Sequence, residues 1–168
     1  MKLIKRKSIQ SLGLGLLLAL SVSVPALAAG AHAGGHGHGH DATDTVIGQP
    51  GVADKVSRTL NVSMRDDMRF SLSDIQVKRG ETIRFVVSND GLLKHEFSLG
   101  TPQELAAHYE MMKKFPDMEH DEPNKVSLAP GEKGEVIWHF TRAGKVDFAC
   151  LHVGHFEAGM KGQVSVSR

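Results

Sequence analysis

Short segments in which inward and outward residues alternate follow one another from about Thr59 to the end of the chain. Side chains two positions apart lie on the same face of a strand, so each alternating segment predicts a strand with one buried face. The clearest inward rows are Ile83, Phe85 and Val87; His95, Phe97 and Leu99; Val136, Trp138 and Phe140; and Val146, Phe148 and Cys150. Turn residues separate these segments, and the last strand is predicted over about 161–166. The pattern predicts an all-β fold, a Greek-key β-sandwich or barrel.

One segment departs from this alternation and predicts a helix. Thr101 is a capping residue, Pro102 occupies the first helical position, and Glu104 completes a capping box. The helix is expected to run to about Lys114, where Phe115 and a following proline end it. Because the whole excursion, about 101–124, is too short to be a domain, we expect one short helix inserted between two strands of the sandwich.

The first 28 residues have the features of a signal peptide. Four basic residues at the start precede an apolar run from Leu12 to Val24, and Ala26-Leu27-Ala28 offers a cleavage site. The alternative is a membrane anchor, but the apolar run is shorter than the roughly 20 residues that a spanning helix needs. We therefore expect cleavage after Ala28, export to the periplasm and no membrane anchor on the processed protein.

Residues 29–54 are rich in glycine, alanine and histidine and carry little hydrophobic patterning, which predicts a flexible tail. Its imidazoles are those of His32, His36, His38 and His40. Closely spaced imidazoles can capture Cu(II), Zn(II) or Ni(II), but a solvated linker without a metal is equally compatible with this composition. Residues 55–168 remain for a single folded domain with one hydrophobic core.

Charge and cysteine content narrow the classes of function. The chain has 20 basic and 19 acidic residues, and the four basic residues of the signal peptide would be lost on cleavage, so nothing in the charge indicates nucleic-acid binding. Cys150 is the only cysteine. An exported chain with one cysteine cannot form an internal disulfide, so this thiol is buried, reactive or bound to a metal.

The residues around Cys150 favour the metal. His155 and Met160 follow it in one short loop, and His95, at the start of a predicted strand, can supply a fourth ligand. A thiolate, two imidazoles and a weakly bound thioether form the His2Cys site with an axial Met that holds copper for one-electron transfer. His152 competes with His155, but His155 follows a glycine in the turn and is the preferred ligand. Each residue alone has a simpler explanation as ordinary core; their order and spacing together predict copper.

These features resemble the cupredoxins, small β-sandwich proteins that hold one type 1 copper. In that family one His comes from the start of a mid-chain strand, and Cys, His and Met come from the loop before the final strand; His95, Cys150, His155 and Met160 fill these places. The spacing Cys-x4-His-x4-Met is most similar to the rusticyanin pattern. Glu96 departs from the small or amide residue that many cupredoxins carry after the first His, which bears on the hydrogen bonds around the copper thiolate.

The resemblance implies a protein that cycles Cu(I)/Cu(II) for one-electron transfer with a redox partner such as a c-type cytochrome or an oxidase. The alternative is copper tolerance by binding, sequestering or oxidising excess copper, because the His-rich tail and a Met-containing helix are also similar to periplasmic copper-tolerance cupredoxins. We do not expect an enzyme, since Ala149 and Leu151 flank the cysteine in place of the His that relays electrons in multicopper enzymes.

The predicted helix and the loop after it raise the hypothesis of a second copper site. Thioethers and imidazoles suit Cu(I), and the region contains Met111, Met112, Met118, His108 and His120. The competing interpretation is that Leu105, Tyr109 and Met112 form an ordinary packing stripe of the helix. The sequence favours this packing stripe.

Overall fold

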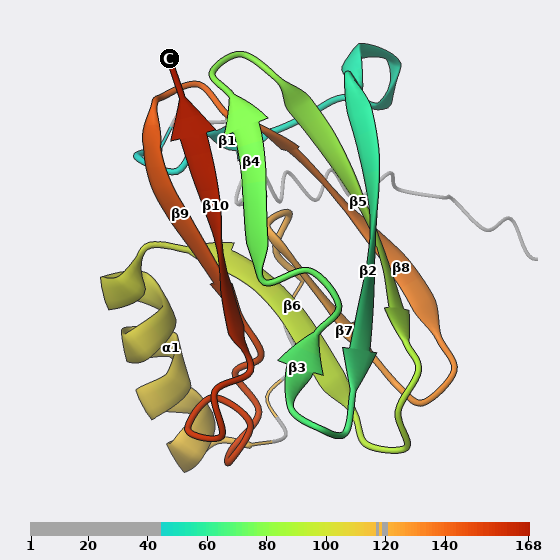
Figure 1. Cartoon of the computed structure of the whole chain (residues 1–168). Coiled ribbons are helices and arrows are strands. Elements are labelled where there is room, and N and C mark those ends of the chain that lie inside the picture. Colours follow the sequence, from blue (N-terminus) through green and yellow to red (C-terminus); the bar gives the residue numbers. More distant parts are fainter. Residues whose placement is uncertain (1–44, 117, 119–120) are drawn as a thin grey trace, which may run out of the picture. The chain divides into compact units, whose positions relative to one another are not determined.

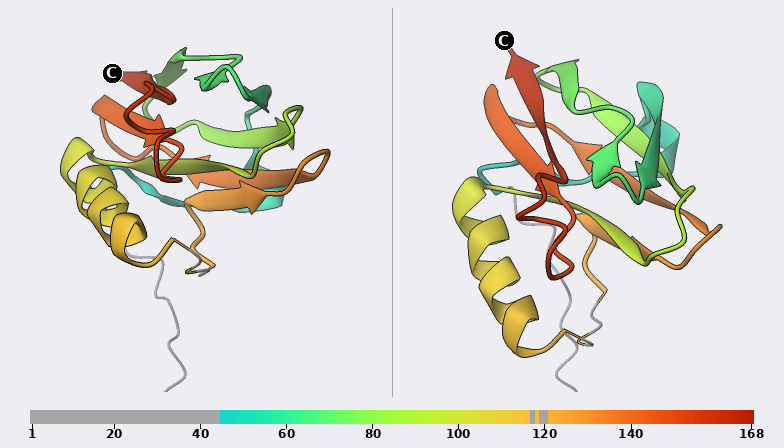
Figure 2. Two further views of the ribbon diagram at one scale, coloured as in Figure 1. Left: turned by 90° about the horizontal axis from the view of Figure 1, so that it is seen from below. Right: turned by 60° about the horizontal axis from the view of Figure 1, so that its bottom comes forward.

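A computed structural model describes residues 45–168 of the chain, except residues 117, 119 and 120. The described residues form two five-stranded sheets that pack face to face, with one α-helix beside them (Figure 1, Figure 2). The expected signal peptide, residues 1–28, and the four tail histidines lie outside the described residues. The all-β sandwich with one inserted helix is therefore confirmed.

The first sheet has the strand order β1-β8-β5-β2-β3. β2 and β5 run parallel, with Leu60 opposite Phe85, whereas the other pairs are antiparallel. The bounds are β1 Gln49–Pro50, β2 Arg58–Arg65, β3 Arg69–Phe70, β5 Thr82–Asn89 and β8 Lys133–His139.

The second sheet has the order β4-β10-β9-β6-β7. β10 runs parallel to β4 and antiparallel to β9, and β6 lies between β9 and β7. The bounds are β4 Asp74–Lys78, β6 His95–Gly100, β7 Lys125–Leu128, β9 Gly144–Ala149 and β10 Lys161–Ser167. The chain thus passes repeatedly from one sheet to the other, as from β4 to β5 and from β5 to β6.

The predicted inward rows form the core between the sheets. All four fully buried phenylalanines, Phe85, Phe97, Phe140 and Phe148, belong to them. Their rings pack against one another, with centroids 5.2 Å apart for Phe85 and Phe97 and 5.0 Å apart for Phe97 and Phe148. Aromatic pairs at this spacing add stabilisation beyond their buried area. Cys150 lies in the same core cluster, so the predicted placement of the thiol on the apolar side is confirmed.

β6 differs from its predicted alternation, because all six of its residues are buried. Its inward residues face the phenylalanine core as expected. Helix α1, Pro102–Lys114, packs against β6 and β9. A strand buries both its odd-numbered and its even-numbered residues when both of its faces are covered. The alternation within β6 cannot show that the element that follows it, α1, packs back against the strand.

Helix α1 begins as predicted. Glu104 N–H donates to Thr101 Oγ1 (3.1 Å), and Thr101 N–H donates to Glu104 Oε2 (2.8 Å), so the capping box is complete. Leu105, Tyr109 and Met112 are the buried residues of the helix, which confirms the packing stripe. Within the described residues, no helix is long and apolar enough to cross a membrane.

The predicted tail boundary at residue 54 is wrong for residues 45–54. Ile47 is buried, and its carbonyl accepts a hydrogen bond from Trp138 Nε1 (2.8 Å). β1 then pairs with β8 at the edge of the first sheet, and a 3-10 turn, Ala53–Lys55, leads into β2. One apolar residue and a two-residue strand are too short to give a hydrophobic pattern, so the sequence alone does not reveal this docking.

Docking of this segment predicts unequal effects of two neighbouring substitutions. Ile47→Ala should lower the free energy of unfolding by about 2–3 kcal/mol, because it removes buried methyl groups beside Trp138. Val46→Ala should change it by no more than about 0.5 kcal/mol, because Val46 is 63% exposed. Urea unfolding of the two variants measures both values. Equal, small effects would contradict docking and favour the flexible tail.

Candidate metal centre

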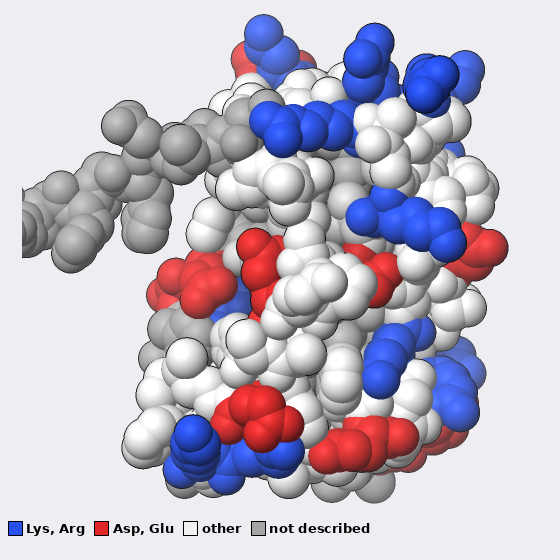
Figure 3. Space-filling model, turned by 90° about the vertical axis from the view of Figure 1, so that its left-hand side faces the viewer, with Lys and Arg blue, Asp and Glu red and all other residues white. Residues whose placement is uncertain are grey.

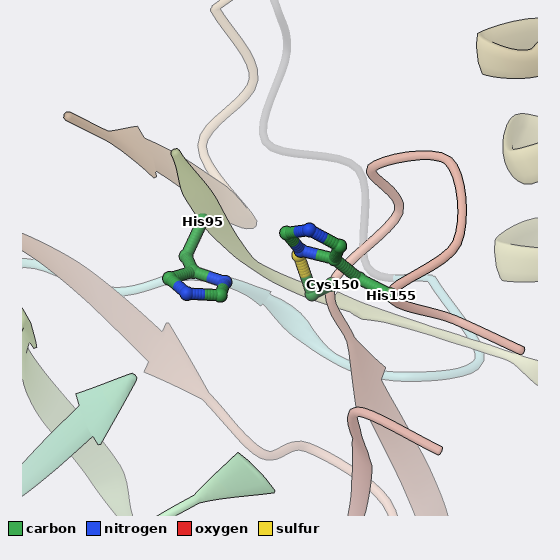
Figure 4. Close-up of side chains that lie close together, drawn as sticks. All are labelled: His95, Cys150 and His155. Atoms are coloured by element: carbon green, nitrogen blue, oxygen red, sulfur yellow. The ribbon is translucent and has the colours of Figure 1, made fainter. Parts of the chain in front are cut away.

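Three of the four predicted ligands meet at one end of the sandwich. His95 is the first residue of β6, Cys150 directly follows β9, and His155 lies in the loop between β9 and β10. One donor atom from each of these residues lies within 4.8 Å of the others. Figure 4 shows the three side chains converging. Two sheet strands and one loop thus bring together residues up to 60 positions apart in the sequence.

Cys150 is a fully buried donor of the site, as is His95. Its Sγ is 3.3 Å from His155 Nδ1 and accepts a hydrogen bond from the Glu96 backbone amide at 3.4 Å. Burial raises the pKa of Cys150 from 9.0 to about 12, although backbone amides of His152 and Glu96 partly offset this effect. Without a cation the thiol therefore stays protonated at neutral pH. A soft metal ion would compensate the charge of the thiolate and displace the proton.

His95 presents one ring nitrogen to a carboxylate and the other to the site. Its Nε2 lies 3.0 Å from Asp66 Oδ1. Its Nδ1 is buried and has no hydrogen-bond partner within residues 45–168 as described. A buried nitrogen without a partner is costly unless something binds it, so this atom fits a metal ligand.

The structure selects His155 rather than His152 as the neighbour of the thiol. His152 lies outside the three-residue cluster, and its ring centroid is 5.7 Å from that of His155. Burial lowers the pKa of His155, and burial together with His155 lowers the pKa of His152 to about 4. Both imidazoles are therefore neutral at pH 7, which is the form that binds metal ions.

The fourth predicted ligand, Met160, is tied to the other loop residues through its backbone. Met160 N–H donates to the His155 carbonyl, and the Met160 carbonyl accepts from Cys150 N–H, both at 3.0 Å. Its side chain is fully buried in the core cluster that contains Cys150. The residue thus closes the loop beside the thiol, and its role as the axial ligand stays a prediction.

Side chains outside the loop hold it in place, and the sequence analysis missed them. Tyr109 of α1 donates a hydrogen bond to Glu157, and its ring stacks on Phe156 with centroids 4.9 Å apart. On the other side, Arg69 Nη1 donates to the Ala158 carbonyl at 2.8 Å. The inserted helix and β3 therefore clamp the loop that carries His155 and Met160. Tyr109 was visible in the sequence only as a member of the packing stripe.

Glu96 occupies the position at which many cupredoxins carry a small or amide residue. It contacts the thiol only through its backbone. Its amide donates to Cys150 Sγ, whereas its side chain points elsewhere: Oε2 accepts from Ser127 Oγ at 3.2 Å, and the residue as a whole is 4% exposed. Burial raises the pKa of the Glu96 carboxyl group. The hydrogen bond to the thiol would be available from any non-proline residue at this position.

A cavity of about 800 Å³ opens beside the site, and His155 forms part of its wall. Met112, Met118 and His152 also line it, whereas His108 and Met111 do not. His120 lies outside the described residues. Of the described residues in the hypothetical second copper site, only Met112 and Met118 line this cavity, and Met112 is 3% exposed within the helix packing stripe. A second copper site therefore stays a hypothesis.

The donor set fits copper. A thiol that becomes a soft thiolate on binding, two imidazoles and a nearby thioether match the ligands that select copper over hard oxygen-preferring cations. The orphaned Nδ1 of His95 and the contact between His155 Nδ1 and the Cys150 sulfur place three of these donors together before any metal binds. Zinc also accepts such ligands, but usually in closed tetrahedral sites richer in cysteine.

Comparison with known proteins agrees with this chemistry. Residues 57–167 match the family model described as copper binding proteins, plastocyanin/azurin family. The chain is 54% identical over 123 residues to the copper-resistant cuproprotein CopI of Rubrivivax gelatinosus, covering 73% of this chain and 74% of that protein. It is 38% identical over 115 residues to CopI of Vibrio cholerae serotype O1, covering 68% of each chain.

Solved structures show the same fold at lower identity. Dithionite-reduced auracyanin from Roseiflexus castenholzii aligns with a TM-score of 0.58 at 19% identity, covering 67% of this chain and 99% of that chain. Auracyanin B aligns with a TM-score of 0.58 at 23% identity, covering 70% and 94%. These matches confirm the predicted cupredoxin sandwich.

The raised pKa of Cys150 predicts an alkaline loss of stability in the metal-free protein. The unfolded chain loses this proton near pH 9 and the folded chain near pH 12, so the stabilisation is complete below pH 9 and falls as the pH rises. Between pH 7.5 and pH 10 the free energy of unfolding should drop by about 1–1.5 kcal/mol more than in Cys150→Ser, which cannot titrate there. Urea unfolding at both pH values measures the difference; parallel pH dependence of the two proteins would contradict it.

Proposed function

Because the chain belongs to the plastocyanin/azurin family of copper-binding proteins, the cupredoxins, we propose that it protects cells against excess copper by binding the ion at this site. The single observation that carries this proposal is the 54% identity to the copper-resistant cuproprotein CopI of Rubrivivax gelatinosus, over nearly three quarters of both chains. The family match over residues 57–167 includes both the sandwich strands from β2 onward and the ligand loop.

On this proposal the ligands are His95, Cys150, His155 and Met160. Copper bound there would supply a one-electron couple between Cu(II) and Cu(I). Cys150 loses its proton on binding and neutralises part of the charge of the ion, and the two imidazoles donate through nitrogens already directed to the site. Met160 completes the set as a weak axial donor. No enzymatic turnover is part of the proposal.

The proposed location is the periplasm, with residues 1–28 removed as a signal peptide. Export places the site where copper enters the cell envelope, and the histidines of residues 29–44 would then form a second, weaker binding region. Basic and acidic side chains occur together on the face shown in Figure 3, so this face does not offer the uniformly basic surface that nucleic-acid binding needs.

Electron transfer is the second candidate function, and the preorganised site favours it. Three donors are held by two strands and a clamped loop, so the ligands would rearrange little between oxidation states. His155 is partly exposed and borders the cavity, which gives an electron a short path to a partner such as a c-type cytochrome or an oxidase. Copper tolerance and electron transfer use the same ligands and differ in what the cell loses without the protein.

Copper titration tests the proposed ligands. The processed chain should bind one Cu(II) with an intense visible thiolate-to-copper absorption, and Cys150→Ser should remove this absorption because serine offers no soft donor. Replacing His32, His36, His38 and His40 by alanine should leave the absorption unchanged and lower only the amount of additional, weakly bound copper. Unaltered absorption in Cys150→Ser would refute the site.

Deletion of the gene tests the proposed role. Cells without the protein should grow normally at low copper and more poorly at high copper, and wild-type protein but not Cys150→Ser should restore growth. The same purified protein, mixed with reduced c-type cytochrome, measures the second candidate by stopped-flow absorption. Wild-type copper tolerance in the deletion strain, together with rapid oxidation of the cytochrome, would replace copper tolerance with electron transfer.

A further inference from the structure

We infer that Asp66 is a positioning residue of the metal centre, which fixes the ring of His95 with Nδ1 toward the metal and favours Cu(II) over Cu(I) through its negative charge. This inference rests on the proposed copper site. Asp66 lies in the turn between β2 and β3 and is 29 positions before His95 in the sequence. Its carboxylate therefore reaches from the first sheet to a ligand on the second.

The hydrogen bond to Asp66 determines which nitrogen of His95 carries the proton. An ionised carboxylate can only accept, so Nε2, 3.0 Å from Oδ1, must be the N–H of the neutral ring. The lone pair is then on Nδ1, the buried nitrogen that has no other partner within the described part of the chain. Asp66 thus holds the tautomer that a metal requires, as outer carboxylates do behind metal-bound histidines.

The carboxylate is itself fixed by the loop that leads to His95. Leu92 N–H donates to Oδ2 at 2.8 Å, and Leu93 N–H donates to Oδ1 at 3.2 Å. Gly91 permits this close approach, since a Cβ at that position would lie 2.1 Å from Oδ1. Three donors therefore hold one side chain, and a change of rotamer would break all three hydrogen bonds.

The charge of Asp66 has a second consequence. Hydrogen bonding to a carboxylate makes an imidazole a stronger donor, and a nearby negative charge stabilises the more positive state of a bound ion. The Asp66 side chain is 36% exposed, so solvent weakens this effect without removing it. Among the described residues, two further titratable groups of the site lie close to His95. The ring of His155, with centroids 4.9 Å apart, is neutral at pH 7, and a donor atom of His95 lies within 4.8 Å of Cys150 Sγ.

Two substitutions at Asp66 and a matched control test the inference. Asp66→Asn keeps the shape and an acceptor oxygen but removes the charge, and Asp66→Ala removes both. Asp90→Asn removes a carboxylate from a neighbouring turn, where it accepts from Ser63 and does not contact His95. The measurements on the copper-loaded proteins are Cu(II) and Cu(I) affinity by chelator competition, reduction potential, and the copper electron paramagnetic resonance spectrum.

We expect Asp66→Ala to bind Cu(II) about 10- to 100-fold more weakly than wild type, with a smaller loss for Cu(I) and an altered resonance spectrum. Asp66→Asn should raise the reduction potential with little loss of Cu(I) affinity, and Asp90→Asn should match wild type. A purely structural role would instead lower the stability of the apo protein and leave the ratio of the two affinities unchanged.

Three outcomes would overturn the inference: wild-type potential in Asp66→Asn, wild-type copper affinity in a folded Asp66→Ala, or an equal shift of potential in Asp90→Asn. Asp66→Asn keeps the test valid if Asp66→Ala does not fold. Failure of the proposed site is recognised separately, because wild-type protein would then lack the thiolate absorption before any change at Asp66.

Discussion

The metal centre depends on a neutral, buried thiol that the fold holds against two imidazoles. In the absence of a cation, burial keeps the proton on Cys150, with a pKa of about 12, so the apolar core around it forms at little electrostatic cost. The phenylalanine rings of β5, β6 and β9 pack in the same cluster as this sulfur. The sandwich can therefore fold first and present its donors afterwards. A buried thiolate would be costly by itself. When a cation replaces the thiol proton, the thiolate forms as one half of an ion pair, and this cost is offset.

A preformed site also requires a loop that does not relax away from the strands. Residues 150–160 are held by backbone hydrogen bonds of Met160 to Cys150 and His155, and by side chains from two directions. Tyr109 binds Glu157 from α1, and Arg69 binds Ala158 from β3. The inserted helix is therefore part of the architecture of the site. Its packing stripe lies against Ala149 and Leu151 and, through Tyr109, also clamps the ligand loop.

The sequence predicts those parts of the fold whose pattern is local. Alternation predicts the inward rows, the capping box predicts α1, and the spacing from Cys150 to Met160 predicts the ligand loop. The sequence does not predict contacts that join distant segments of the chain. The docking of Ile47 beside Trp138 leaves no periodic signal, and the burial of Ser98 on the polar side of β6 is not indicated by the alternation either. The convergence of His95 with Cys150 was predicted from the need for a further ligand and from family resemblance, since no spacing rule joins residues on different strands.

The residues behind the ligands are the least visible in the sequence, although they separate the two candidate functions. Asp66 stands in an ordinary polar turn, and only its contacts with His95 and with the amides before it distinguish it from Asp67. A carrier and a copper-tolerance protein can share one ligand set, because both need reversible binding of one copper ion. An anion behind His95 favours the oxidised ion, which suits a protein that retains Cu(II) better than one that must readily accept an electron. On the proposed assignment, therefore, the surroundings of the ligands argue for copper tolerance, in agreement with the similarity to CopI.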